Sequence, residues 1–326
     1  PKEGQEDEFS FNLQVAFDDE TCLVTQQEYV APEKMFHKDY AYRGSMSLTM
    51  VDHFQKTAKL LSESLPPSPR VLEIGSNDGV FLNNWDTDNT YDLQETFQAV
   101  ANVLEDEGLF VFEDPSLARM INLNSYDQIY DEHAHIFSVI ALKNELERVG
   151  LSLIRVDNLS VHGGSNRIWA AKTTSEWAKY VHISVEENIT YEKLLGLDNI
   201  AVFDKFSSRV AQSKQDLLDV LYRCKENDQK VISYGATSKS TTVFNYCGID
   251  DNLISYITDT TPEKQGKLAP GSHIPVVAPK DNSIADDVNY VFLGAWNFVD
   301  EISKKEKAFI DRGGKFITHV PLVRFV

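Results

Sequence analysis

Hydrophobic residues recur at helical spacing in several long stretches of the chain. Where every third or fourth residue is apolar, the apolar side chains share one face of a helix. This spacing predicts helices at residues 48–63, 92–107, 200–226 and 301–310, and a shorter helix at 141–149. Pro66 ends the first helix and Gly150 closes the short one, because proline cannot continue a helix and glycine accepts the conformation that follows one.

Shorter apolar or alternating runs predict strands between these helices. They fall at residues 71–74, 108–114, 151–159 (an edge strand), 168–171, 253–259, 288–293 and 315–319, and two more lie within residues 11–30. From Lys230 onwards strands and helices alternate, which favours a mainly parallel sheet with a site at the carboxyl ends of its strands. We therefore predict an α/β fold with a small β-rich amino-terminal lobe, and expect the polar residues 174–199 to cross between domains.

The chain is strongly acidic. It has 326 residues, of which 50 are acidic and 31 basic, so its formal net charge is −19. Nucleic acids and anionic membranes require a basic surface, and this charge argues against both as partners. A small anionic ligand stays compatible with it, since backbone amides and a few local cations can hold a phosphate.

Cysteine usage and hydropathy narrow the class of protein further. Three scattered cysteines, Cys22, Cys224 and Cys247, give no disulfide framework. We find no apolar run near 18 residues and no signal-peptide pattern. The hydrophobic content of 42% suffices for packed cores, and the length favours two domains. We expect a soluble, cytoplasmic protein and leave monomer and homodimer open.

One stretch, Asp127–Ser138 (DQIYDEHAHIFS), concentrates titratable groups. Its acids, imidazoles and phenol are Asp127, Tyr130, Asp131, Glu132, His133 and His135. An imidazole titrates near neutral pH and its neighbours tune it, so this mixture suits a proton-transfer site. The alternative is a polar loop with two surface histidines.

A second stretch, VLEIGSNDG at residues 71–79, predicts a cofactor turn. An acidic residue near the end of a buried strand precedes two glycines, which let the backbone approach a nucleoside-bearing cofactor. The pattern fits S-adenosylmethionine (SAM) better than a dinucleotide, for which G-x-G-x-x-G is usual. A plain structural turn is the alternative. The residues that we expect to hold SAM are Glu73, Gly75, Ser76, Asn77 and Gly79.

A glycine turn at residues 162–167 suits a phosphate or a sugar, which its backbone amides would cradle. An ordinary hairpin explains the same residues equally well. The residues that we predict to bind substrate here are His162, Gly163, Gly164, Ser165 and Arg167.

The carboxyl-terminal half adds further candidates for substrate binding. Gly235 opens a turn into a predicted helix whose first residues include Lys239. A lysine adds nothing favourable to the amino end of a helix, so an anionic ligand is the better explanation for it. Residues 261–276, with Lys264 and His273, form a loop that we interpret as a lid or ligand clamp, and Asn297 follows the strand at 288–293.

Seven stretches taken together resemble the sugar C-methyltransferases of deoxysugar biosynthesis. They occur in the order of that family: YAYRGSMS (40–47), VLEIGSNDG (71–79), YDEHAHIFS (130–138), HGGSNR (162–167), YGATSKSTT (234–242), TPEKQGKLAPGSHIPV (261–276) and GAWNF (294–298). Members of the family methylate C3 of a nucleotide-linked 4-keto-6-deoxy sugar with SAM. The resemblance implies a cytoplasmic enzyme whose substrate is a nucleotide-linked keto-deoxysugar, expected to be a dTDP-sugar.

The resemblance implies three parts. They are a remnant of a zinc-binding lobe at 1–45, a Rossmann-like SAM domain at 46–175, and a second Rossmann-like domain at 176–326 that helps bind the sugar nucleotide. Of the lobe's cysteines only Cys22 is present, and one thiolate does not make a zinc site. Only the polar run 83–90 stands where the family has several strand–helix units. Either residues are missing between Leu82 and Asp92 or the cofactor half has been pared down, and we favour the first.

The resemblance also implies catalytic roles. The Y-x-E-H of the family falls on Tyr130, Glu132 and His133. His133 is the expected base for the C3 proton, and Glu132 orients the imidazole or a sugar hydroxyl. Tyr130 or Tyr42 is expected to donate to the enolate oxygen, and Tyr40 is the second choice to Tyr42.

Two other functions stay open. One is a nicotinamide-dependent sugar-nucleotide oxidoreductase, since Gly75 and Gly235 each open a Rossmann-like unit, although neither has the full G-x-G-x-x-G spacing. The other is a non-catalytic nucleotide-sugar-binding protein with a degenerate SAM site. Within the methyltransferase interpretation, His135 competes with His133 as the base.

Overall fold

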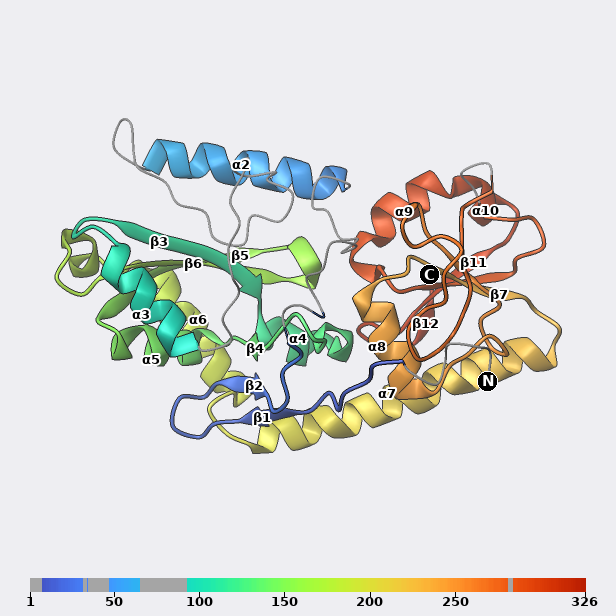
Figure 1. Cartoon of the computed structure of the whole chain (residues 1–326), viewed down its shortest axis with the longest axis horizontal. Coiled ribbons are helices and arrows are strands. Elements are labelled where there is room, and N and C mark those ends of the chain that lie inside the picture. Colours follow the sequence, from blue (N-terminus) through green and yellow to red (C-terminus); the bar gives the residue numbers. More distant parts are fainter. Residues whose placement is uncertain (1–7, 32–33, 35–46, 65–92, 281–283) are drawn as a thin grey trace.

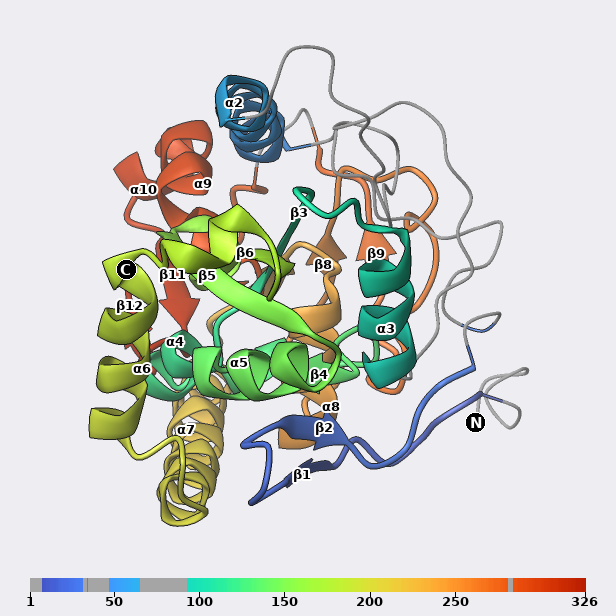
Figure 2. The ribbon, with the colours of Figure 1, turned by 90° about the vertical axis from the view of Figure 1, so that its left-hand side faces the viewer.

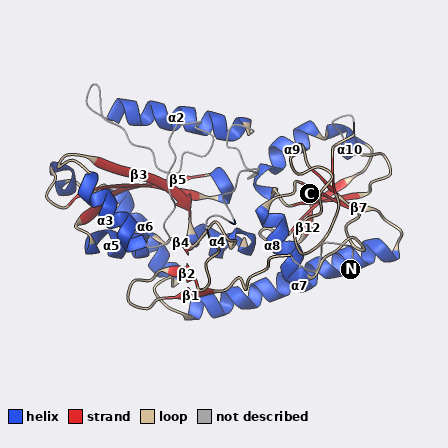
Figure 3. Ribbon diagram, in the orientation of Figure 1, coloured by secondary structure: helices blue, strands red, loops and turns tan. Residues whose placement is uncertain are grey.

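The computed structural model describes residues 8–31, 34, 47–64, 93–280 and 284–326. The strands of this part of the chain form three sheets, connected and covered by helices (Figure 1; Figure 3). This arrangement confirms the predicted α/β class. None of the described helices is both long enough and apolar enough to cross a membrane.

The first sheet joins the amino-terminal hairpin to the titratable stretch. Strands β1 (Val15–Phe17) and β2 (Val24–Gln26) pair antiparallel, as the two β-like runs within residues 11–30 predict. Strand β2 also pairs antiparallel with β4 (His135–Ile136). Because β4 lies within Asp127–Ser138, the hairpin holds one end of that stretch in place.

The second sheet is antiparallel, with β6 (Ser165–Lys172) between β3 (Leu109–Pro115) and β5 (Leu151–Leu159). Among the described strands β5 lies at an edge, as predicted. Successive β6 side chains point to opposite faces, so Ile168 and Trp169 join different apolar clusters. The helices on these faces (Figure 1) are α2 (Leu48–Ser64) on one side and α3 (Leu93–Val103), α5 (Val139–Arg148) and α6 (Ile183–Leu195) on the other.

The third sheet belongs to the carboxyl-terminal half and has the order β12-β11-β10-β7-β8-β9. All neighbouring pairs are parallel except β11 and β12, which confirms the predicted mainly parallel sheet. Its strands are β7 (Val231–Tyr234), β8 (Ile257–Thr258), β9 (Val276–Val277), β10 (Tyr290–Leu293), β11 (Lys315–Thr318) and β12 (Arg324–Phe325). Its helices are α8 (Ser238–Cys247), α9 (Val299–Lys305) and α10 (Lys307–Asp311).

The long helix α7 (Ala201–Glu226), seen lengthwise in Figure 1 and nearly end-on in Figure 2, lies along both halves of the molecule. It confirms the helix predicted at 200–226. Leu217 on its apolar stripe is fully buried. This side chain shares one core with Leu117 of the short helix α4 (Leu117–Leu123) and with Phe244 of α8. The two halves therefore share apolar packing and do not meet only at a polar surface.

The helix predicted at 301–310 is wrong as a single element, because α9 and α10 break at Glu306. The Glu306 side chain is 3% exposed, and its carboxylate accepts a hydrogen bond from the Tyr234 hydroxyl at 3.1 Å. Glu306 has φ of −97° and ψ of 31°, outside the helical range, so the helix is interrupted at this residue.

Residues 174–199, which we expect to cross between domains, contain α6, and the Ile183 and Leu194 side chains of this helix are exposed. One other local prediction also needs correction. Only β8 forms within the strand predicted at 253–259, since the residues before it make a turn closed by hydrogen bonds to the carbonyl oxygen of Asp250.

Candidate functional site

The stretch from Asp127 to Ser138 is held between the hairpin and the carboxyl-terminal half. Its first residues belong to the 3₁₀ turn η2 (Tyr126–Gln128), which lies against α8. On the other side, Nε2 of Gln26 donates to the carbonyl oxygens of Tyr130, at 2.6 Å, and His133, at 2.9 Å. These contacts fix the backbone that carries the predicted acids and imidazoles.

The Nδ1 atom of His133 lies 2.7 Å from the carbonyl oxygen of Gln128. A carbonyl oxygen only accepts hydrogen bonds, so Nδ1 carries the proton and Nε2 keeps a lone pair. Burial, opposed by this hydrogen bond and reinforced by the charge of Lys239, lowers the pKa of His133 to about 4. The imidazole is therefore neutral at pH 7, the form in which it can accept a proton.

The predicted catalytic residues of the Y-x-E-H motif share one turn. The ring of Tyr130 packs on the imidazole of His133, with 4.1 Å between ring centroids. Glu132 is half-buried in the same turn. Tyr42 and Tyr40, the other candidates to contact a sugar, lie outside the described residues.

The hairpin engages two further predicted residues. Nδ1 of His135 lies 3.1 Å from the hydroxyl oxygen of Thr25, across the β2–β4 pair. The imidazole of His135 therefore contacts the hairpin, whereas the imidazole of His133 contacts η2. Cys22 lies buried near the hairpin turn, and burial raises the pKa of its thiol. Within the described ranges, no group of three or more His, Cys, Asp or Glu side chains could hold a metal ion.

Three side chains of the third sheet gather near Asp127. Lys239 follows β7, Trp296 follows β10 and His319 follows β11. These strands are adjacent and parallel, so the residues after them meet at one edge of the sheet. Nε1 of Trp296 donates to Oδ2 of Asp127 at 2.6 Å, and Nε2 of His319 lies 3.5 Å from the same oxygen.

The groups around Asp127 form a buried charged cluster. Asp127 and His319 are fully buried and Lys239 is 9% exposed. Burial alone would raise the pKa of the Asp127 carboxyl, but His319, Lys239 and the Trp296 N–H hold it below its usual range. Burial lowers the pKa of Lys239, and the charge of Asp127 opposes this effect. The Asp127 carboxylate therefore acts on the lysine through its charge, and contact of the lysine with a ligand stays a prediction.

The predicted glycine turn packs against the carboxyl-terminal half. His162 has φ of 53° and Gly163 has φ of 87°. A Cβ atom at Gly163 would lie 2.3 Å from Cη2 of Trp296, and one at Gly164 would lie 2.8 Å from Cγ of Arg119. Glycine at these positions leaves room for two large side chains, which explains the sequence without a bound phosphate.

The structure brings His162 into the same region as His133 and Lys239. Burial, followed by the charge of Lys239, lowers the pKa of His162 to about 4. The Lys239 ammonium thus acts on both imidazoles. Two neutral imidazoles and one buried ammonium, from three separate stretches of the sequence, therefore lie within electrostatic reach of one another.

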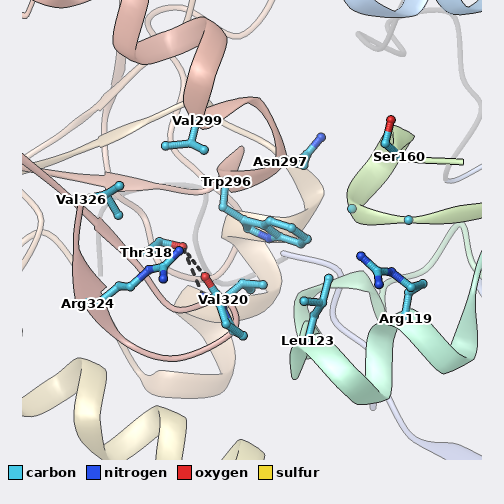
Figure 4. Close-up of a pocket in the computed structure, with 13 residues that line it drawn as sticks. Arg119, Leu123, Ser160, Trp296, Asn297, Val299, Thr318, Val320, Arg324 and Val326 are labelled. Atoms are coloured by element: carbon cyan, nitrogen blue, oxygen red, sulfur yellow. Dashed lines mark hydrogen bonds between the residues drawn. The ribbon is translucent and has the colours of Figure 1, made fainter.

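A cavity of about 310 Å³ opens between the glycine turn and the carboxyl-terminal half (Figure 4). Arg119 of α4 and Ser160 lie on one wall, and Trp296, Asn297 and Arg324 lie on the other. Within the described part of the chain, neither arginine forms an ion pair. Two cations beside one cavity of a chain with net charge −19 suit a negatively charged ligand.

Arg167, predicted to bind substrate, is buried in β6. Its guanidinium donates to Glu113 at 2.7 Å and to the Thr57 hydroxyl at 2.5 Å, and Nε2 of His53 lies 2.5 Å from Glu113. This network fixes α2 on the second sheet. Ser165 donates to the carbonyl oxygen of a neighbouring residue in the glycine turn.

Three other predicted substrate residues also have partners within the protein. Gly235, with φ of 88°, leads from β7 towards α8. Lys264 donates to the carbonyl oxygen of Ala236 at 2.8 Å, which ties its loop to the same turn. His273 lies 2.6 Å from the carboxylate of Glu8. Their contact with a substrate stays a prediction.

The residues expected to hold SAM lie outside the described part of the chain, as does the expected interruption between Leu82 and Asp92. They are Glu73, Gly75, Ser76, Asn77 and Gly79. SAM binding by these residues stays a prediction.

Sequence reasoning missed Trp296 and His319 as partners of Asp127. Both follow predicted strands, and the carboxyl ends of neighbouring parallel strands meet, so this signal was present in the sequence. It also missed Arg119, for which the sequence carries no signal. That residue reaches the cavity only because α4 docks beside the third sheet.

Two comparisons with known proteins bear on the identity of the chain. A family model described as the C-methyltransferase C-terminal domain matches residues 160–321. C-methyltransferase NovU of Streptomyces niveus is 31% identical over 235 residues, which cover 72% of this chain and 55% of the relative. The chain thus spans about half the length of the curated relative it matches. The resemblance drawn from the sequence motifs is confirmed, and the chain belongs to the C-methyltransferase family.

Proposed function

We propose that this chain carries the base site of a SAM-dependent C-methyltransferase that acts at C3 of a nucleotide-linked 4-keto-6-deoxy sugar. The supporting observation is the hydrogen bond from Nδ1 of His133 to Gln128. It leaves the Nε2 lone pair of a neutral imidazole available, beside a phenol and a buried ammonium. This combination suits removal of a proton from carbon next to a ketone.

The proposed step begins with proton transfer from C3 of the sugar to Nε2 of His133. The electron pair of the broken C–H bond moves into the ring, and the C4 ketone becomes an enolate oxygen. Tyr130 or Tyr42 donates a hydrogen bond to that oxygen, and Glu132 orients the imidazole or a sugar hydroxyl. When bound, SAM would supply a methyl group on a sulfonium; the bond from C3 to the methyl carbon would form as the methyl–sulfur bond breaks, a neutral thioether would leave, and His133 would return its proton to solvent. General-base and oxyanion contributions are each worth about a hundredfold or more.

We infer that the nucleotide part of the substrate lies in the cavity between the halves. Arg119 and Arg324 can neutralise a diphosphate, and Asn297 and Ser160 can bond polar groups of the ligand. The indole of Trp296 on the wall offers a flat apolar surface to a base or sugar ring. We further propose that residues 46–175 form a Rossmann-like SAM domain. Residues 176–326 would form a second Rossmann-like domain that binds a dTDP-sugar.

The test separates deprotonation from methyl transfer. The protein is incubated in D₂O with a dTDP-linked 4-keto-6-deoxy sugar, and exchange of the C3 proton is followed by NMR without SAM. Methyl transfer is followed separately with labelled SAM. We expect His133→Ala to abolish both reactions while the affinity for dTDP stays near the wild-type value. His135→Asn is the matched control, because this imidazole contacts the hairpin. Exchange that survives in His133→Ala and is lost in His135→Asn would assign the base to His135.

A non-catalytic nucleotide-sugar-binding protein is the second candidate. One observation favours it, namely that Arg119 and Arg324 beside the cavity suit a nucleotide whether or not a reaction follows. Calorimetry distinguishes the two functions. An enzyme is expected to bind both SAM and the sugar nucleotide, whereas the binding protein binds the sugar nucleotide alone and exchanges no proton at C3.

A further inference from the structure

The hydrogen bond between Trp296 and Asp127 connects the carboxyl-terminal sheet to the turn that precedes His133. Asp127 is the middle residue of η2, and its Oδ2 accepts from the indole N–H at 2.6 Å. The carboxylate is fully buried, and Oδ1 has no hydrogen-bond partner among the described residues. The indole is therefore the close hydrogen-bond donor that orients this side chain.

Turn η2 is fixed to the carboxyl-terminal half by a second residue. The ring of Tyr126 meets the rings of Tyr246 and His319 edge-on, with centroid distances of 5.6 and 5.4 Å. Tyr126 is 4% exposed. Contacts from two successive residues, Tyr126 and Asp127, set both the position and the rotation of the turn. The backbone of the following residue is then no longer free to move independently.

That following residue is Gln128, whose carbonyl oxygen accepts the proton of His133 Nδ1. Its side chain also donates to the Ser125 hydroxyl at 2.9 Å, which closes the turn on itself. A neutral imidazole has two tautomers, and the hydrogen bond to Gln128 favours the one with an unprotonated Nε2. The rotation of η2 thus decides which nitrogen of His133 carries the proton.

We propose that Asp127, held by the indole N–H of Trp296, is a positioning residue through which the carboxyl-terminal half fixes the tautomer and orientation of His133. The proposal rests on the proposed function only in taking His133 as the base. It gives the carboxyl-terminal half a task beyond substrate binding, because docking of its sheet is required for a correctly oriented imidazole. Trp296 touches the glycine turn as well, so the same residue links both stretches to the third sheet.

The chain offers a matched control for this hydrogen bond. The indole N–H of Trp169 donates to Asp157 at 2.8 Å, between strands of the second sheet. Trp169→Phe and Trp296→Phe remove the same donor from the same kind of pair, and both keep an aromatic ring. Only the second pair lies next to η2.

The experiment reads the imidazole directly. The full chain is labelled with ¹⁵N-histidine, and the ring nitrogen shifts of His133, assigned with His133→Gln, are recorded at pH 7. The wild-type protein and Trp169→Phe are expected to show protonated Nδ1 and unprotonated Nε2. Trp296→Phe is expected to show a mixture of tautomers and a C3 exchange rate lower by about 10- to 100-fold, since small misplacements of a reacting group cost that much. Circular dichroism of both variants is the check on folding, because Trp296 itself lines the cavity.

Asp127 supplies a second pair of variants for the case that Trp296→Phe does not fold. The side-chain oxygen of Asp127→Asn can still accept from the indole, whereas Asp127→Ala cannot. The Asn variant is expected to keep the wild-type tautomer and the Ala variant to lose it. Unchanged His133 shifts in Trp296→Phe or Asp127→Ala would overturn the proposal. Changed shifts in a wild-type protein that exchanges no sugar proton would support the positioning and contradict the proposed function.

Discussion

Gly163 lies so close to Trp296 that a Cβ atom at that position would come within 2.3 Å of the indole ring. The glycine belongs to a turn between β5 and β6, and the tryptophan follows β10 of the third sheet. The contact shows why two glycines follow His162. They make room for the docking of the carboxyl-terminal half, whatever ligand the neighbouring cavity holds.

We expect Gly163→Ala to lower the free energy of unfolding by about 3 kcal/mol, from backbone strain at positive φ and from overpacking against the indole. Gly150→Ala is the matched control, since Gly150 has φ of 74° and open space around its Cα. It should cost about 1 kcal/mol from strain alone. Urea unfolding of the two variants measures the difference. Equal losses would show that Trp296 moves aside without cost.

The rate of C3 exchange should have its acid limb near pH 4. Burial lowers the pKa of His133 to about 4, and the active form of a base is the unprotonated one. The base form is therefore present throughout the range above about pH 4. Exchange rates are measured from pH 3.5 to 8, with circular dichroism confirming the fold at each point. An acid limb of the exchange rate near the ordinary histidine pKa would mean that another imidazole is the base.

His162 should make the stability of the protein depend on pH. Its pKa is about 4 in the folded state and about 6.5 in the unfolded chain, so the unfolded state binds more protons between these values. The contribution of His162 to the free energy of unfolding is fully present above about pH 6.5 and is lost as the pH falls towards 4. It amounts to on the order of 3 kcal/mol in all.

The check for His162 is the difference in unfolding free energy between the wild-type protein and His162→Asn, because Asn also tolerates positive φ. This difference should fall between pH 6.5 and 4.5. Taking a difference cancels other groups, such as Glu192, whose pKa burial raises to about 7 and which acts in the opposite direction. A difference that stays constant with pH would contradict a neutral, buried His162.

The two arginines of the cavity should govern nucleotide affinity. We expect Arg119→Gln and Arg324→Gln each to weaken dTDP binding about tenfold, the effect of losing one charged hydrogen bond, with little change in the C3 exchange rate at saturation. Arg148→Gln removes the same charge from an exposed ion pair with Glu20 and is the control. Isothermal titration calorimetry gives the affinities. Equal affinity in all three variants would place the diphosphate elsewhere.

Local signals in the sequence accounted for the elements whose order depends on their own residues. The apolar stripe of residues 200–226 predicts α7, and the alternation of residues 151–159 predicts β5. The motif order predicted the family, and the mixture of acids and imidazoles at 127–138 predicted the candidate base site. These signals succeed because helix and strand periods are properties of neighbouring residues.

Contacts between distant residues could not be predicted in this way. Asp127 and Trp296 are 169 positions apart, and the Glu306 carboxylate at the break between α9 and α10 accepts from a hydroxyl of another strand. The sequence showed a lysine, Lys239, at the start of α8. It did not show that the charge of the buried Asp127 carboxylate would act on this lysine. The amino-acid sequence therefore specified the chemistry of the site. Only the docking of the two halves decided which groups are neutral, which are paired and which nitrogen of His133 is protonated, because burial and charge act through space.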